Sequence, residues 1–344
     1  MPERQTFEIA ERPIGQGQAC YVIAEIGINH GGDEGCCADL ITAAAEAGAD
    51  AAKLQTVTPD HSYHPDTESY ALFKDSVLSD DALRRLMAHA RAAGIALFST
   101  PGDLAALALI GGVDMPALKI SSGLLTNLPL IKAAAATGRP LILSTGMAHL
   151  AEVLAARDAA SGAGAQALAF LHCTSLYPAP PEQLNLRAMA TLREATGCVV
   201  GYSDHHDGDA ACVAAVAAGA ALIEKHVTLD ATTPGADHAI SLEPAAFAAM
   251  VKRVRELETM LGSDAKVPTP DEEPLREARH RRLVAARTMQ AGERIAADDL
   301  YLMRLPAETA AMPAAELDAV VGHRTSRPVA RLEGITVDML TGDD

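Results

Sequence analysis

The sequence predicts a (β/α)8 barrel followed by a small β-rich domain. Eight short apolar segments alternate with Ala-rich segments between residues 20 and 227, and the Ala-rich segments carry apolar residues at helical spacing. The short segments are almost continuously apolar, which is typical of parallel strands buried on both faces. Eight strand–helix units in about 200 residues fit a closed barrel. An open, doubly wound sheet is the alternative.

The expected elements follow one another at regular intervals. Gly48, Gly94 and Gly219 each end a helical segment just before the next strand, as helix-terminating glycines do. Helices are expected at 34–47, 80–93, 150–160 and 242–261. The expected strands are 21–26, 51–55, 95–99, 117–121, 140–144, 167–172, 198–202 and 221–227.

The composition changes after residue 262, where the segment 262–274 is rich in Pro and charge. We expect a barrel over 1–262, a linker over 263–279 and a second domain over 280–344. The last domain contains a weak internal repeat, since IAADDL at 295–300 and ITVDML at 335–340 each follow a turn-like Gly-containing segment. Each copy predicts a turn, a strand end and a short helix capped by Asp, so the domain is expected to be pseudo-symmetric.

Charge and cysteine usage exclude several classes of protein. The net charge of −17 argues against binding to a nucleic-acid backbone. The six cysteines form no C-x-x-C pair, and reduced, buried thiols are expected. The first 15 residues are polar without an apolar signal core, and the Ala-rich helices are interrupted by Gly and charge. We therefore expect a cytoplasmic protein that binds neither nucleic acid nor membrane.

Polar or ionisable residues follow every expected strand, which core packing does not explain. In a (β/α)8 barrel the carboxyl ends of the strands hold the catalytic groups. Lys53 and Lys119, with hydroxyls and Gly turns beside them, suit a compact anion carrying phosphate and carboxylate. A structural ion pair of either lysine with Glu25 or Glu224 is the alternative.

Two histidines end neighbouring strands, His205 after the seventh and His226 in the eighth. Because the strand ends are neighbours, their imidazoles are expected to be able to share one ion, and neutral His is a common transition-metal ligand. With no thiolate pair at hand, His, carboxylate and water favour Mn²⁺, with Mg²⁺ or Co²⁺ possible. His206 is expected to point away from this site.

Nine segments in register resemble the sialic acid synthase family, which includes N-acetylneuraminate, legionaminate and pseudaminate synthases. The resemblance covers nearly the whole chain, and the tail is similar to the family's antifreeze-like (SAF) domain, a β-clip fold. The matching segments are Ile23-Ala-Glu25-Ile-Gly-Ile-Asn29-His30-x-Gly32, Lys53-Leu-Gln55-Thr56, Ser99-Thr100-Pro101, Lys119-Ile-Ser-Ser122-Gly123, Leu143-Ser144-Thr145-Gly146-Met147, His172-Cys-Thr-Ser175-Leu-Tyr177-Pro178, Gly201-Tyr-Ser203-Asp204-His205, Glu224-Lys225-His226 and Gly235-Ala-Asp237-His238.

The resemblance implies a domain-swapped homodimer in which each SAF domain caps the partner's barrel. It implies Mn²⁺ at His205 and His226. Glu25, at a strand end, is the candidate for proton transfer at the aldehyde or water, and an ion pair with a pocket lysine is its alternative role. Arg304 sits where the family's SAF arginine reaches the partner's acyl-amino sugar, although the sequence after it (Leu305-Pro306-Ala307) departs from the family's usual Pro-Gly. The implied phosphoenolpyruvate contacts are Thr100, Lys119, Ser122, Ser144, Ser175 and Ser203 with Lys53 nearby, and the implied sugar contacts are Glu25, Gln55, Tyr177 and Asp237.

The expected reaction is the condensation of phosphoenolpyruvate with an N-acylated amino sugar such as N-acetylmannosamine, giving a nine-carbon 2-keto acid and phosphate. A legionaminate- or pseudaminate-type synthase acting on a diacetamido deoxyhexose is the alternative within this class. A metal-dependent barrel aldolase or isomerase that does not use phosphoenolpyruvate is the alternative of another class. A non-catalytic binding protein is a third possibility, which the intact His pair, lysines and Glu25 oppose.

Overall fold

Eight parallel strands form a closed barrel in the computed structural model, which describes residues 6–235, 237–306 and 308–342. Each strand is hydrogen-bonded to its sequence neighbours, and β10 pairs with β3 to close the ring. The predicted barrel and all eight predicted strands are confirmed. The strands are β3 (Tyr21–Gly27), β4 (Ala51–Thr56), β5 (Ala96–Pro101), β6 (Leu118–Ile120), β7 (Leu141–Ser144), β8 (Leu168–Cys173), β9 (Val199–Asp204) and β10 (Leu222–His226).

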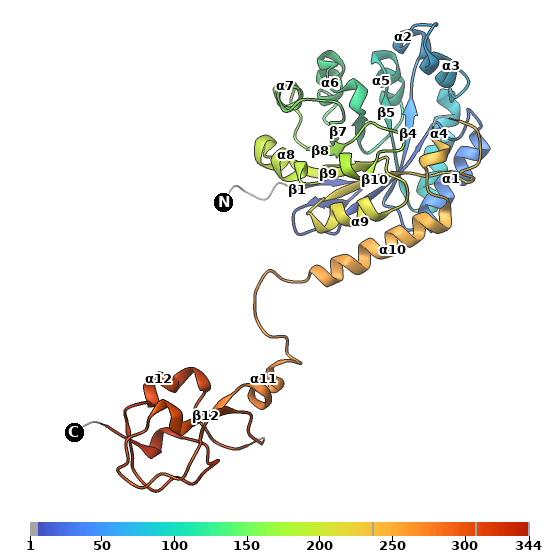
Figure 1. Cartoon of the computed structure of the whole chain (residues 1–344). Helices are drawn as coiled ribbons and strands as arrows, with labels where there is room; N and C mark the ends of the chain where they lie inside the picture. The colour runs from blue at the N-terminus through green and yellow to red at the C-terminus, as the bar shows by residue number, and fades with distance from the viewer. Residues whose placement is uncertain (1–5, 236, 307, 343–344) are drawn as a thin grey trace. The chain divides into compact units, whose positions relative to one another are not determined.

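Helices surround the strands on the outside of the barrel (Figure 1). Their starts are fixed by side chains: Asp33, Ser79 and Asp103 each accept a hydrogen bond from the first turn of the helix that follows. Gly94, at φ +72°, ends α4 in the left-handed region. The helices are α1 (Glu34–Glu46), α2 (Pro59–Ser62), α3 (Glu68–Lys74), α4 (Asp80–Ala93), α5 (Leu104–Gly111), α6 (Leu128–Ala135), α7 (Leu150–Gly162), α8 (Ala188–Thr196), α9 (Ala210–Ala217) and α10 (Pro244–Leu261).

A two-stranded hairpin precedes the barrel, and the sequence did not predict it. Strands β1 (Thr6–Ile9) and β2 (Arg12–Gly15) pair antiparallel, and Ile9 and Ile14 are buried in the main core. A pocket of about 630 Å³ is lined by the hairpin together with Tyr21, Ala96 and Leu97, which lie at the starts of β3 and β5. The hairpin therefore lies at the amino ends of the strands, and the carboxyl ends form the opposite face.

Gly201 in β9 allows the closest backbone approach in the barrel wall. A Cβ there would lie 2.3 Å from the Leu222 carbonyl oxygen and 2.7 Å from Leu171 Cδ2. Because neither neighbour can move without disturbing the strands, Gly201→Ala is expected to lower the free energy of unfolding by about 3 kcal/mol. Chemical denaturation measures this loss. Gly111→Ala in α5, where no atom lies within 4 Å of the added Cβ, is the matched control and should not lower stability.

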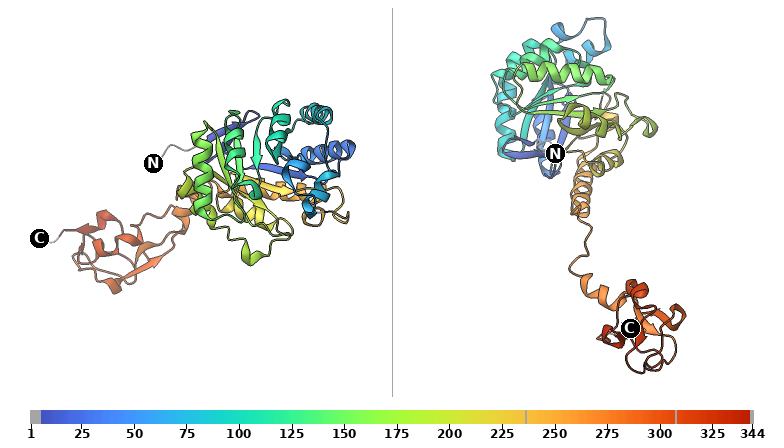
Figure 2. Two further views of the ribbon diagram at one scale, coloured as in Figure 1. Left: turned by 90° about the horizontal axis from the view of Figure 1, so that it is seen from above. Right: turned by 90° about the vertical axis from the view of Figure 1, so that its left-hand side faces the viewer.

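The chain divides into two compact units, Met1–Gly262 and Ser263–Asp344. The expected linker, 263–279, contains helix α11 (Glu273–Arg279). In the second unit, β11 (Arg282–Ala285) pairs with β12 (Leu300–Met303), and β13 (Arg324–Thr325) pairs with β14 (Leu340–Thr341). Figure 2 shows the two units in two further views.

The second unit contains the predicted internal repeat. Met289 and Val329 are joined by an antiparallel bridge, and both lie in the unit's small apolar core with Ile295 and Ile335. Matching ion pairs join Arg287 to Glu293 (2.6 Å) and Arg327 to Glu333 (2.8 Å). The order of elements differs in one respect, because in each copy the strand follows the short 3-10 helix (Ala297–Asp299 and Val337–Met339). In the first copy Asp299 caps the helix by accepting from Ala296 N.

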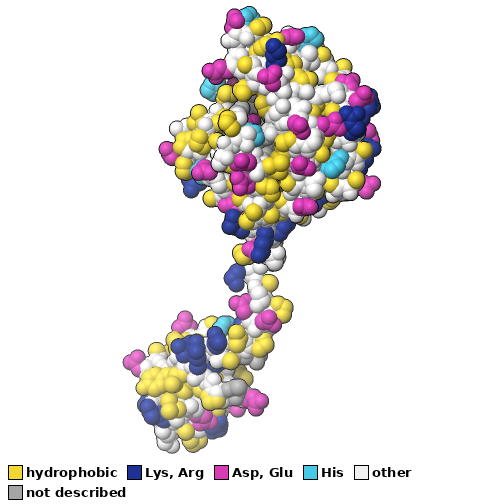
Figure 3. Space-filling view, turned by 90° about the vertical axis from the view of Figure 1, so that its right-hand side faces the viewer, with side chains coloured by type: hydrophobic (Ala, Val, Ile, Leu, Met, Phe, Trp, Pro, Cys, Tyr) yellow, Lys and Arg dark blue, Asp and Glu magenta, His cyan; other side chains and the backbone are white. Residues whose placement is uncertain are grey.

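The surface carries dispersed charge. On the face of the barrel unit in Figure 3, acidic and basic side chains are interspersed with apolar ones. Within the part of the chain that the structure describes, no helix combines the length and apolarity needed to cross a membrane.

Candidate active site at the carboxyl ends of the barrel strands

Four buried charged side chains meet inside the barrel, two lysines and two glutamates. Lys53 forms an ion pair with Glu25, and its Nζ lies 3.7 Å from Glu224 Oε2. Lys119 Nζ lies 3.4 Å from Glu224 Oε1. The ion pairs that the sequence offered as an alternative are therefore present. Because charges in a low-dielectric interior are costly unless paired, the four side chains form one balanced cluster.

The two glutamates differ in their affinity for protons. Burial raises the pKa of Glu25 to about 6, and the ion pair with Lys53 offsets only part of the shift. Burial also acts on Glu224, but Lys119, Lys53 and the hydrogen bond from Ser203 Oγ (3.0 Å) outweigh it and lower its pKa to about 2. Near neutral pH, Glu224 is thus a fixed negative charge. Glu25 is the carboxyl whose protonation changes in the range where enzymes work.

Serine hydroxyls line the next part of the mouth, which is the end of the barrel formed by the carboxyl ends of the strands. Gly146 N donates to Ser122 Oγ at 3.0 Å, and a Cβ on Gly146 would lie 2.2 Å from Ser175 Oγ. Ser122, Gly146 and Ser175 therefore converge on one point. Ser144 Oγ and Ser175 Oγ are buried without a hydrogen-bond partner among the described residues. Buried hydroxyls are normally paired, so these two suit the oxygens of a bound anion.

Two further predicted anion contacts are occupied by neighbours. Thr100 Oγ1 accepts from Lys53 Nζ at 3.2 Å. Ser203 Oγ donates to Glu224. Both hydroxyls lie beside the charged cluster. Their hydrogen bonds orient the Lys53 ammonium group and the Glu224 carboxylate.

His205 and His226 face each other at the ends of β9 and β10, with ring centroids 5.4 Å apart. His205 Nδ1 lies 2.9 Å from the Thr174 carbonyl oxygen, so Nδ1 carries the proton and Nε2 has a free lone pair. Burial lowers the pKa of His226, and its Nδ1 has no hydrogen-bond partner among the described residues. His206 turns away, as predicted, with its Nδ1 2.9 Å from the Ala179 carbonyl oxygen.

These two imidazoles fit one divalent ion. Metal–nitrogen bonds of about 2.1 Å place the centres of two adjacent imidazoles about 5 Å apart, close to the separation found here. No group of three or more His, Cys, Asp or Glu suited to a metal occurs among the described residues. An ion at this place would therefore take its remaining ligands from water or substrate, which is the pattern of a catalytic site.

The predicted sugar contacts surround the same mouth. Gln55 Nε2 donates to Glu25 Oε1 at 3.2 Å. The Tyr177 ring stacks on His205, with centroids 4.1 Å apart. Asp237 Oδ2 lies 3.8 Å from His226 Nδ1. The barrel thus brings together every predicted site residue that its own unit contains.

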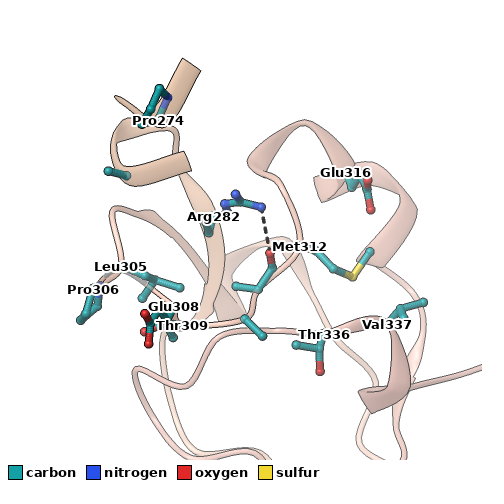
Figure 4. A pocket seen from close by; sticks show the side chains of 13 residues that line it. Pro274, Arg282, Leu305, Pro306, Glu308, Thr309, Met312, Glu316, Thr336 and Val337 are labelled. Carbon is teal, nitrogen blue, oxygen red and sulfur yellow. Dashed lines mark hydrogen bonds between the residues drawn. The ribbon is translucent and has the colours of Figure 1, made fainter. Parts of the chain in front are cut away.

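Arg304 lies in the second unit, where its side chain is exposed and Nε donates to the Arg279 carbonyl oxygen at 3.2 Å. A pocket of about 660 Å³ in that unit lies beside α11 (Figure 4), and Arg282 in it donates to the Ala311 carbonyl oxygen. Arg304 is not among the residues that line this pocket. The prediction that Arg304 contacts a sugar stays a prediction.

Sequence reasoning left out several residues of the mouth. Glu224 was considered only as an ion-pair partner, yet it joins both lysines. Its place two residues before His226 in the same strand was the available signal, because such residues share a face. Cys173, whose Sγ lies 3.7 Å from His205 Nδ1, gave no comparable signal.

The family model of the NeuB family matches residues 40–266 of this chain, and the model of the SAF domain matches residues 280–341. The chain belongs to the NeuB family. The predicted family and the predicted SAF domain at the C-terminal end of the chain are therefore confirmed.

The relatives of this chain include synthases of sialic-acid-type sugars. The chain is 36% identical to the N,N'-diacetyllegionaminic acid synthase of Legionella pneumophila, over 92% of this chain and 93% of that protein. It is 34% identical to the N-acetylneuraminate-9-phosphate synthase of Mus musculus, over 84% of each. The N-acetylneuraminic acid synthetase of Leptospira borgpetersenii, solved with citrate, superposes with a TM-score of 0.76 at 32% identity, over 80% of this chain and 96% of that chain.

Proposed function

We propose that this NeuB-family chain condenses phosphoenolpyruvate with the open-chain aldehyde of an N-acylated amino sugar, giving a nine-carbon 2-keto acid and phosphate. The observation that carries the proposal is the convergence at one barrel mouth of two buried lysines, unpartnered serine hydroxyls and a facing pair of histidines. This set matches the three parts of the reaction: an anion with phosphate and carboxylate, a polarised aldehyde, and an activated water.

The anion end is supported by charge and by geometry. Phosphoenolpyruvate needs both positive charge and hydrogen-bond donors, which Lys53, Lys119 and the hydroxyls of Ser144 and Ser175 supply. The absence of a side chain at Gly146 lets the hydroxyls of Ser122 and Ser175 come together beside the turn, because a Cβ there would overlap Ser175 Oγ. The same lysines would stabilise the negative charge of phosphate as it leaves.

His205 and His226 would hold a divalent ion, for which we propose Mn²⁺. Such an ion supplies Lewis acidity and lowers the pKa of water. The carbon–carbon bond forms between C3 of phosphoenolpyruvate and the aldehyde carbon. Glu25 takes one proton from the water that adds at C2 and returns it to the former aldehyde oxygen. The bond from C2 to the phosphate oxygen then breaks, and the second proton of that water leaves with the phosphate as the C2 keto group forms. A carboxyl with a pKa of about 6 suits both transfers.

The acceptor is the second part of the proposal. We propose an N-acylated amino sugar such as N-acetylmannosamine, contacted by Gln55, Tyr177 and Asp237. The 36% identity with a N,N'-diacetyllegionaminic acid synthase over nearly both chains favours a diacetamido deoxyhexose as the second candidate. We further propose a domain-swapped homodimer in which Arg304 of one protomer completes the sugar site of the other, within the cytoplasm.

An acceptor panel tests this function. Phosphate release from phosphoenolpyruvate is measured with Mn²⁺ and with N-acetylmannosamine, its 6-phosphate, or a diacetamido deoxyhexose as acceptor. Release that depends on one of these sugars supports the proposal and names the acceptor. Absence of release with all of them, combined with carbon–carbon cleavage of a sugar acid by the same enzyme, would favour a metal-dependent aldolase.

The rate of phosphate release is expected to fall as the pH drops through about 6, because Glu25 must be ionised to take a proton. Glu25→Gln should lower the rate by about 10²- to 10⁴-fold and remove this limb of the pH profile. The contribution of Glu25 to stability does not produce this fall in rate, because it has the opposite pH dependence. A carboxyl whose pKa is raised in the folded state stabilises the fold most below its ordinary value, and that contribution is lost as pH rises through about 6. A variant that keeps the limb would contradict the role of Glu25.

A further inference from the structure

A fully buried ion pair lies behind the two histidines. Asp204 in β9 and Lys225 in β10 are both 0% exposed, and Lys225 Nζ lies 2.9 Å from Asp204 Oδ2. The two residues are directly paired in the parallel register of the strands. Each comes one residue before a histidine of the mouth, so their side chains project from the opposite side of the strands, toward the helices.

This pair also holds the backbone beyond His205. The His206 N–H donates to Asp204 Oδ1 at 2.9 Å, and Lys225 Nζ donates to the His206 carbonyl oxygen. The residue after His205 is thus held at both of its peptide groups, one by its own strand and one by the strand of His226. The ion pair therefore ties the loop that carries His205 to the strand that carries His226.

Two more donors fix the Asp204 carboxylate. Tyr202 Oη donates to Oδ1 at 3.0 Å, and Cys212 Sγ, from helix α9, donates to Oδ2 at 3.5 Å. With Lys225 and the His206 amide, the carboxylate has four donors from four different residues. A carboxylate satisfied in this way has little freedom to rotate or shift.

Stability alone does not account for such a pair. Desolvation of two buried charges consumes most of their attraction, so well-packed apolar residues at such positions are often as stable or more so. Helix α9, which packs against β9 and β10, buries only small or apolar side chains, and these would pack against apolar residues. An apolar pair could not form hydrogen bonds. Only the ion pair binds the two peptide groups of His206 and so fixes their orientation.

We propose that Asp204 and Lys225 are positioning residues that set the separation of His205 and His226 and thereby their affinity for a divalent ion. The inference rests on the metal site of the proposed function. Outer partners that orient metal ligands change metal affinity without touching the ion. The 5.4 Å between the imidazole centroids is the quantity that the ion pair controls.

The test removes both charges together, because loss of one partner would leave the other charge buried and unpaired. In Asp204→Leu/Lys225→Met, Mn²⁺ affinity, measured by the free-ion EPR signal without substrates, is expected to fall about 10- to 100-fold. The matched control is Asp50→Leu/Arg255→Met, which removes a part-buried ion pair (3.1 Å) at the amino ends of the strands. The control should change the melting temperature and leave Mn²⁺ affinity as in wild type.

A second variant keeps the proposal testable if the double variant does not fold. Tyr202→Phe removes one donor from Asp204 and should weaken Mn²⁺ binding in the same direction by a smaller factor. Unchanged affinity in a folded double variant, or in Tyr202→Phe if only that variant folds, overturns the proposal. Wild-type protein that binds no Mn²⁺ contradicts the metal site instead. In that case the crystal structure of either variant decides, since an unchanged 5.4 Å separation of the rings overturns the positioning role by itself.

Discussion

We expect His226→Ala to abolish phosphate release from phosphoenolpyruvate and to weaken Mn²⁺ binding by more than about 100-fold, because we propose that the two imidazoles hold the ion. The ring lies buried at the end of β10, and its Nδ1 has no partner among the described residues, so it has no hydrogen bond to lose. The variant should therefore lose Mn²⁺ binding and activity while its free energy of unfolding changes little. Phosphate assays and Mn²⁺ titration of the same preparation measure both effects.

The matched control for this variant is His89→Ala. His89 is a half-buried histidine of α4, on the outside of the barrel, whose Nε2 lies 2.8 Å from Thr42 Oγ1. Its replacement should leave phosphate release and Mn²⁺ affinity unchanged. Full activity of His226→Ala, or activity of the wild type that a strong chelator does not reduce, would exclude the metal assignment.

Lys119→Met should lower phosphate release by about 10³-fold and the free energy of unfolding by about 3 kcal/mol. Lys119 is one of two cations beside the buried Glu224, and burial already lowers the pKa of its own ammonium group despite the attraction of that carboxylate. Without Lys119, the anion site loses charge and Glu224 loses a partner. Single-turnover kinetics and chemical denaturation measure the two effects separately.

A second variant separates binding from folding. Lys119→Met/Glu224→Leu removes one positive and one negative charge, and so leaves the Lys53–Glu25 ion pair in place. Stability should recover toward the wild-type value, because no buried charge remains unpaired. Phosphate release should stay low, since the substrate still lacks Lys119. Recovery of the rate along with stability would show that Lys119 has a structural role alone.

The barrel could be predicted from the sequence because its strands are buried on both faces and therefore continuously apolar. Each boundary in β3 to β10 was found to within one or two residues. The N-terminal hairpin was missed because β1 and β2 are four residues each and present only Ile9, Ile14 and Phe7 to the core. Such short strands lack a hydrophobic period that distinguishes them from loop.

The residues that form the candidate site could be predicted from the sequence. The contacts between these residues could be predicted less well. Alternation along a strand identified Lys53 with Gln55, and the strand ends identified the histidines. The sequence left open whether the lysines serve an anion or an ion pair, and the structure shows that the ion pairs exist beside unpartnered serine hydroxyls. The role of Asp204 and Lys225 depends on cross-strand register, which one sequence does not contain.

The central claim is that this mouth joins three carbons of phosphoenolpyruvate to a sugar aldehyde, and mass spectrometry of the product tests it most directly. Phosphoenolpyruvate labelled with ¹³C at all three carbons is incubated with Mn²⁺ and the accepted amino sugar. We predict one product containing the intact sugar and all three labelled carbons as a 2-keto acid, with one phosphate released for each molecule formed. Labelled pyruvate as the sole product, or phosphate release that does not depend on the sugar, would contradict the account.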